Sequence, residues 1–173
     1  MKRLILWIQI CLWILCFTCP AMGDIIAGQF VFPDQSTQSE ILYVTCKPDR
    51  GRTLYAIIET SGYGEWALYL PPGSYALRFR GRKWLDVSIK AITGTLFDPI
   101  TMIAGNVNWD NRIDDDDLTR LGMVFNRIVP PTPPDWQPGE YTSDEEVCDL
   151  NADGVVDIED LAILAANWGR IGQ

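Results

Sequence analysis

The amino-acid sequence predicts two domains, an all-β antiparallel sandwich followed by a small all-α unit that carries two calcium loops. Short β-rich runs separated by turn residues fill residues 25–96. Residues 106–117 and 149–160 then repeat each other at an offset of 43 residues. Charge divides at the same place, because residues 24–99 carry 8 acidic and 8 basic residues and residues 100–173 carry 15 acidic and 4 basic residues. The expected domains are therefore 24–99 and 100–173, after a leader at 1–23.

The first 23 residues have the pattern of a secretory signal peptide. Two cations precede an apolar run, Leu4–Phe17, and small residues stand at positions 21 and 23, just before Asp24. The run is short for a membrane-spanning helix. We expect cleavage after Gly23, a secreted or cell-surface protein, and membrane contact only through the signal peptide. The alternatives are an uncleaved anchor and a lipoprotein signal at Cys19.

Composition excludes several classes of function. Hydrophobic residues make up 47% of the chain, which is enough for a packed core. There is no histidine, so catalysis by a Ser-His-Asp or Cys-His arrangement and His-ligated metal sites are excluded. A net charge of −9 disfavours a nucleic-acid partner. The carboxylates of residues 24–99 are scattered, so we predict no catalytic residue and no enzymatic activity.

Two cysteines remain after the leader is removed, Cys46 and Cys148. In an exported protein they could form one disulfide that joins the two expected domains. The alternative is two separate thiols, with Cys46 buried in a strand. The sequence does not decide between them.

Six runs of residues are expected to be strands, and proline- and glycine-rich turns lie between them. The runs are Ile25–Phe32, Ile41–Lys47, Leu54–Glu59, Glu65–Leu70, Ser74–Arg80 and Trp84–Ile89. Alternation places Trp66, Leu68 and Leu70 on one face of their strand, and Tyr75, Leu77 and Phe79 on one face of theirs. Such strands at regular spacing are typical of an antiparallel sandwich.

Residues 66–85, WALYLPPGSYALRFRGRKWL, carry a resemblance to a known family. They resemble the LPPGSYxLRxKxxxWL segment of small Ig-like, prealbumin-like sandwiches of the carboxypeptidase regulatory-domain class, over roughly residues 25–98. The resemblance implies a spacer or a binding module. On physical grounds, the Pro71-Pro72-Gly73 turn brings Leu70 and Tyr75 together.

Two features of this half have both a functional and a plain interpretation. Arg78, Arg80, Arg82 and Lys83 form a basic cluster beside Trp84. It is either an anion- or sugar-binding patch or a solvated strand face, and the solvated face is favoured. Trp66 and Trp84 are expected in the core rather than on a carbohydrate platform.

Each repeat in the acidic half has the spacing of a calcium loop, with oxygen side chains at positions 1, 3, 5, 9 and 12. Position 7 would give its backbone carbonyl. Position 6, Asn111 or Gly154, suits a left-handed backbone, and the apolar position 8, Ile113 or Val156, is expected to pair the two loops. The predicted ligands are Asn106, Asn108, Asp110, Arg112, Asp114 and Asp117 in the first loop and Asp149, Asn151, Asp153, Val155, Asp157 and Asp160 in the second.

A short helix is expected after each loop but not before it. Asn126 and Gly169 are expected to end the two helices in a left-handed conformation. Residues before the first loop look extended, and Trp136–Val147 looks like plain loop. The apolar faces of the two helices, expected to form a core with the loops, carry Leu118, Leu121 and Phe125, and Leu161, Leu164 and Trp168.

The second repeat, DLNADGVVDIEDL, is similar to the DxNxDGxVxxxDL repeat of type I dockerins. The resemblance covers about residues 103–173. It implies a module that folds on binding calcium and docks its helices onto a cohesin domain. Arg127 and Arg170 match positions that are often basic and implicated in recognition, so they are the predicted partner-binding residues. Asn106 stands where the family has aspartate, which predicts weaker calcium binding in the first loop than in the second.

Together these features predict a secreted, non-catalytic, calcium-binding dockerin-domain protein. It would be an adaptor that binds a cohesin-type partner in extracellular polysaccharide degradation. The alternatives are a carbohydrate-binding module with a polysaccharide ligand, or a calcium-stapled spacer without a cohesin partner. A fragment of a glycoside hydrolase is a further alternative.

Overall fold

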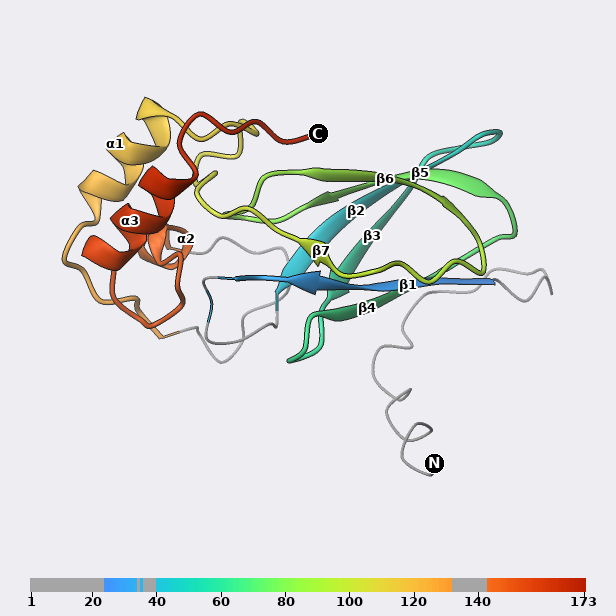
Figure 1. Cartoon of the computed structure of the whole chain (residues 1–173), viewed down its shortest axis with the longest axis horizontal. Helices are drawn as coiled ribbons and strands as arrows, with labels where there is room; N and C mark the ends of the chain where they lie inside the picture. The colour runs from blue at the N-terminus through green and yellow to red at the C-terminus, as the bar shows by residue number, and fades with distance from the viewer. Residues whose placement is uncertain (1–23, 34, 36–39, 132–142) are drawn as a thin grey trace, which may run out of the picture.

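Residues 24–33, 35, 40–131 and 143–173 are described by a computed structural model (Figure 1). In them, two sheets face each other and short helices gather at one end. The strands are β1 (Asp24–Val31), β2 (Ile41–Pro48), β3 (Leu54–Glu59), β4 (Glu65–Leu70), β5 (Ser74–Arg80), β6 (Val87–Ile92) and β7 (Ile100–Thr101). The helices are α1 (Asp115–Met123), α2 (Asp144–Cys148) and α3 (Ile158–Ala166). The predicted leader lies outside the described residues.

One sheet has the strand order β4-β1-β7 and the other β3-β2-β5-β6. All pairings are antiparallel except that of β7, which runs parallel to β1 and places Ile100 opposite Phe30. The predicted bounds of β3, β4 and β5 are confirmed. Strand β6 begins at Val87 instead of Trp84, because Trp84 forms an isolated antiparallel bridge to Ala104.

The core between the sheets is rich in aromatic rings. Phe30 stacks on Trp66 with ring centroids 5.5 Å apart and meets Phe79 edge-on at 5.0 Å. The predicted inner faces of β4 and β5 are buried, and Trp66 and Trp84 are both in the core, as expected. Tyr75 is buried beside the turn, and its hydroxyl donates a 2.8 Å hydrogen bond to the Pro71 carbonyl.

The predicted fold class is wrong in its second part, because no separate all-α dockerin module follows the sandwich in the described residues. The helices are short, at 9, 5 and 9 residues. The buried side chains of the loops and helices belong to the same hydrophobic core as Trp84 and Met102 of the sandwich side. These side chains are Val107, Ile113, Leu121, Val124, Val147, Cys148, Leu150, Val156 and Leu164. The loops and helices therefore extend the sandwich core.

Exposure explains why the helices form no core of their own. Of the side chains expected there, Leu121 and Leu164 are fully buried and Leu161 is partly buried. Phe125 and Trp168 are 37% and 44% exposed, and Leu118 is 39% exposed. A period of three and four residues identifies a helix face, but it does not show what covers that face.

The expectation that no helix precedes either loop is wrong for the second loop. Helix α2 ends at Cys148, directly before Asp149. Ser143 caps its start by accepting a hydrogen bond from the Glu146 amide at 3.2 Å. The rest of the expected loop, up to residue 142, lies outside the described residues. None of the described helices is long and apolar enough to span a membrane.

Candidate metal centre

Two loops at the helical end have the same internal hydrogen bonds: the first loop, Asn106–Asp117, and the second loop, Asp149–Asp160. At position 12, Asp117 accepts backbone N–H groups from Val107, Asn108 and Asp114 at 2.8, 3.1 and 2.9 Å. Asp160 accepts the equivalent three from Leu150, Asn151 and Asp157 at 2.6, 3.2 and 2.8 Å. Both carboxylates are fully buried, so each closes its loop onto the start of the following helix.

The turn inside each loop also repeats. Position 1 accepts the backbone N–H of position 6, from Asn111 to Asn106 Oδ1 and from Gly154 to Asp149 Oδ2. Asn111 and Gly154 have φ values of 70° and 95°, which confirms the predicted left-handed position. Position 4 is left-handed as well, with φ of 71° at Trp109 and 59° at Ala152, and sequence reasoning missed it.

Burial changes the acidity of the position 12 carboxyls. Desolvation raises the pKa of both Asp117 and Asp160, and the three backbone N–H donors of each oppose that rise. A carboxylate offers about four lone pairs, so three hydrogen bonds leave little for a metal ion. Both residues therefore have a structural role, and their predicted role as metal ligands stays a prediction.

Three other carboxylates of the first loop converge. Oxygens of Asp110, Asp114 and Asp116 all lie within 4.8 Å of one another. A calcium ion holds its oxygens at 2.3–2.6 Å, so ligands on opposite sides of it stand up to about 5 Å apart. The donor set therefore fits a hard cation. Sequence reasoning missed Asp116, at position 11, because the loop pattern assigns the ligand to position 12.

The second loop arranges its acidic groups differently. Its residue at position 11 is Glu159, and the Asn151 amide donates both to Glu159 at 3.1 Å and to Asp153 at 3.0 Å. The helix cap is shared, because Asp157 accepts the Glu159 N–H at 2.8 Å as Asp114 accepts the Asp116 N–H at 3.1 Å. The described residues of this loop include no triad of carboxylates as close as that of the first.

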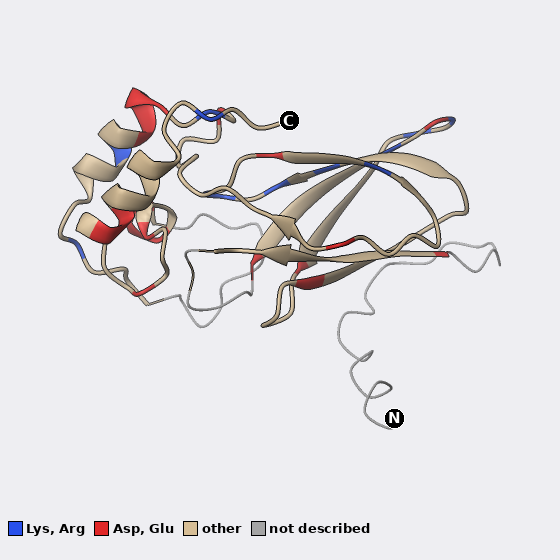
Figure 2. Cartoon of the chain, in the orientation of Figure 1, with Lys and Arg blue, Asp and Glu red and all other residues tan. Residues whose placement is uncertain are grey.

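The remaining predicted ligands lie in equivalent places. Asn108 and Asn151 each accept the N–H of position 5, both at 3.0 Å. Position 5 in turn accepts the N–H of position 7, from Arg112 at 2.8 Å and from Val155 at 2.9 Å. The predicted set is thus brought together within each loop. Figure 2 shows acidic residues gathered around the ends of α1 and α3.

Each loop pairs with the segment that follows the opposite helix. Ile113 donates to the Arg170 carbonyl at 3.0 Å and accepts from Gly169 at 2.8 Å. Val156 donates to the Arg127 carbonyl at 2.9 Å and accepts from Asn126 at 2.7 Å. The position 8 residues thus join the repeats through these crossed ladders, whereas the sequence predicts that they pair with each other. Asn126 and Gly169 have φ of 63° and 76°, as predicted.

The predicted partner-binding residues both follow the helices. Arg127 forms a 3.1 Å ion pair with Glu145, and its side chain is 61% exposed. A backbone hydrogen bond, followed by the hydrogen bond and charge of Arg127, lowers the pKa of the Glu145 carboxyl. Arg170 is exposed. Their role in recognition stays a prediction.

The predicted solvated strand face is found at Arg78 and Arg80, whose side chains are 48% and 40% exposed, but both arginines also form ion pairs. Arg78 and Arg80 donate to the buried Asp86 at 2.7 and 3.3 Å. Lys83 is buried and lies 3.8 Å from a Glu40 carboxylate oxygen. Arg78, Arg80 and Lys83 thus each have an acidic partner within the fold, which favours a structural role for the cluster over an anion-binding patch.

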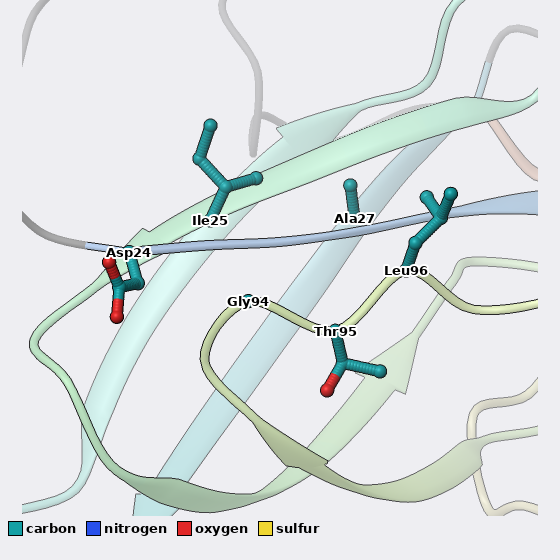
Figure 3. A pocket seen from close by; sticks show the side chains of 6 residues that line it. All are labelled: Asp24, Ile25, Ala27, Gly94, Thr95 and Leu96. Atoms are coloured by element: carbon teal, nitrogen blue, oxygen red, sulfur yellow. The ribbon is translucent and has the colours of Figure 1, made fainter.

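A shallow pocket lies at the start of β1, away from the helices (Figure 3). Asp24, Ile25, Ala27, Gly94, Thr95 and Leu96 line it. The Thr95 hydroxyl donates to the Ile92 carbonyl at 2.6 Å. Asp24 is the one ionisable side chain in this lining, so the pocket has no acid–base pair.

Cys46 and Cys148 are both buried and free, so of the two alternatives the separate thiols are found. Burial raises the pKa of the Cys46 thiol and raises that of Cys148 to about 12.

We expect both thiols of the folded, leaderless protein to react with a charged disulfide reagent at pH 8 at least ~100-fold more slowly than in denaturant. Thiol titration checks this, and finding no thiol in denaturant would instead mean that a disulfide had formed.

No protein-family model and no curated protein matches the chain. Two crystal structures have a similar chain, both of complexes described as interface mutants of a type II Cohesin-X-Dockerin complex from Acetivibrio cellulolyticus. The C-terminal interface mutant has a TM-score of 0.60 at 22% identity, and the N-terminal interface mutant 0.58 at 18%. Each alignment covers 87% of this chain and 98% of the other. Similarity at this identity shows a shared fold.

The expected function is wrong in the light of this similarity. The described residues contain no separate dockerin module, because they form mostly a β-sandwich, and the alignment to the shared fold covers 87% of the chain. The alternatives of a carbohydrate-binding module, a spacer and a hydrolase fragment do not fit either. These similarities support the predicted β-sandwich, but not the resemblances to a type I dockerin and to a prealbumin-like sandwich.

Proposed function

We propose that the protein is a non-catalytic, extracellular assembly module that pairs with another protein module of the cohesin–dockerin class. The observation that carries this is the shared fold over 98% of the length of a chain from a Cohesin-X-Dockerin complex. The proposed partner is a protein module, because the chains that share this fold come from complexes between protein modules.

Pairing is tested by capture on the immobilised full-length mature protein. A type II dockerin and a type II cohesin are the two probes, each applied in calcium and in EDTA. We expect one of the two to be retained in calcium and released by EDTA, and the probe that is retained tells which side of the pair this chain occupies. An unrelated β-sandwich is the matched control surface. Retention of neither probe would overturn the proposed function.

We further infer that both loops bind calcium. The convergence of Asp110, Asp114 and Asp116 supports this, as do the equivalent backbone hydrogen bonds at position 12 of the two loops. Calcium would supply the positive charge that a region with 15 acidic and 4 basic residues lacks. Extracellular calcium modules work with dissociation constants of about 10⁻⁴–10⁻³ M.

Removal of calcium is expected to lower the melting temperature of the protein. At free calcium 100 times the dissociation constant, each site adds about 2.7 kcal/mol, or roughly 5–10 °C for a chain of this size. The second loop is expected to bind more tightly, since Asp149 has a carboxylate where Asn106 has none. Thermal melts in calcium and EDTA and a calorimetric titration check both statements. Absence of binding at millimolar calcium would contradict the inference.

A further inference from the structure

A short segment of the sandwich, Lys83–Asp86, contacts both loops at the same position. The Lys83 ammonium donates to the Asp149 backbone carbonyl at 2.8 Å. The Asn106 side-chain amide donates to the Trp84 carbonyl at 3.1 Å. Both bonds are buried. Adjacent residues of one segment thus hold position 1 of the first loop and position 1 of the second.

The same segment has further bonds to the first loop and to the end of the chain. The backbone N–H of Asp86 donates to Asn111 Oδ1, at position 6, over 2.8 Å. The Asp86 carbonyl accepts the Gln173 N–H at 3.1 Å. Asp86 itself is held by Arg78 and Arg80 of β5. A chain of hydrogen bonds therefore joins the first loop to β5, a central strand of the four-stranded sheet.

The chemistry of Asn106 fits a tether better than it fits a weakened ligand. Its side chain is 1% exposed, and its two polar atoms have opposite tasks. Oδ1 accepts the Asn111 N–H while Nδ2 donates to the Trp84 carbonyl. An aspartate could perform the first task but has no proton to donate in the second. In the second loop both carboxylate oxygens of Asp149 accept backbone N–H groups. The bond to the sandwich is there donated by the Lys83 ammonium to the Asp149 carbonyl.

We propose that Lys83 and Trp84 are positioning residues for both calcium loops, and that Asn106 is a tether to the sandwich in place of a calcium ligand. Calcium binding is thereby linked to the stability of the sheets. This rests on the proposed calcium binding. The two roles predict opposite results for Asn106→Asp. If Asn106 is a weakened calcium ligand, the restored carboxylate should keep or increase the effect of calcium on the sheets. If Asn106 is a tether, loss of the amide donor should reduce that effect.

The test is backbone amide hydrogen exchange of β2 and β5 in the full mature chain, in calcium and in EDTA, beside a calcium titration. In the unaltered protein, chelation should speed exchange of these amides about tenfold or more. Asn106→Asp should still bind calcium, but the calcium effect on exchange should fall to about threefold or less. An equal or larger calcium effect in Asn106→Asp would overturn the proposal and restore the ligand role.

Lys83→Met tests the second tether, with Lys90→Met as the matched control. Lys90 lies exposed on β6, so its variant should behave like the unaltered protein. Lys83→Met should reduce the calcium effect on sheet exchange at least about threefold. Calcium binding without any effect on the sheets of the unaltered protein overturns this inference alone. If the titration shows no calcium binding, the proposed calcium binding is overturned, and the tether role that rests on it is overturned as well.

Discussion

Replacement of Asp160 by alanine is expected to lower the free energy of unfolding by about 3–4 kcal/mol even in EDTA. The carboxylate is fully buried and accepts three backbone N–H groups, from Leu150, Asn151 and Asp157. Alanine leaves these donors without a partner, and a buried unsatisfied donor costs about 1–3 kcal/mol. Denaturant unfolding in EDTA measures this part, because no calcium contributes there.

Two further variants separate the hydrogen bonds from the charge. Asp160→Asn keeps one acceptor oxygen and should lose roughly half as much free energy of unfolding as Asp160→Ala. Glu159→Ala removes the neighbouring, exposed carboxylate and should change the free energy by about 0.5 kcal/mol or less. If Asp160→Ala is as stable as Glu159→Ala in EDTA, the buried carboxylate does not hold the loop closed.

Local signals account for most of the strands. Alternating apolar residues define Glu65–Leu70 and Ser74–Arg80, flanking turn residues define Leu54–Glu59, and the bounds of all three are confirmed. The parallel pairing of Ile100 with Phe30 has no such signal, since it joins residues 70 positions apart through a two-residue strand. Long-range pairs of this kind depend on the packing of the whole chain.

The sequence does contain a signal for helix α2, although this helix is not among the predicted elements. Ser143 followed by Glu146 three residues later is the pattern of a helix start, and Ser143 does cap α2. Proline-rich residues precede this signal and favour a loop, so the segment is predicted as loop. No comparable sequence signal predicts that the helices pack on the sandwich. Leu121 and Leu164 would face inward in a separate module as well as in the shared core.

The loops were predictable where backbone geometry dictates the residue. Left-handed positions at Asn111, Gly154, Asn126 and Gly169 follow from residue types that tolerate positive φ. Which carboxylates converge was not predictable, because a position in a loop pattern does not reveal competing hydrogen bonds. The backbone N–H groups around Asp117 occupy that carboxylate, and the structure places Asp116 in the triad instead.

Asp116→Ala is therefore expected to weaken calcium binding at the first loop about tenfold or more. In EDTA the same change should leave stability equal or slightly higher, because it relieves repulsion among three carboxylates that lie within 4.8 Å of one another. Asp115→Ala is the matched control: Asp115 is adjacent, exposed and equally charged, but it is not part of the triad. A calorimetric calcium titration of both variants makes the comparison. Equal weakening by Asp115→Ala and Asp116→Ala would show that general charge, and not the triad of Asp110, Asp114 and Asp116, attracts the ion.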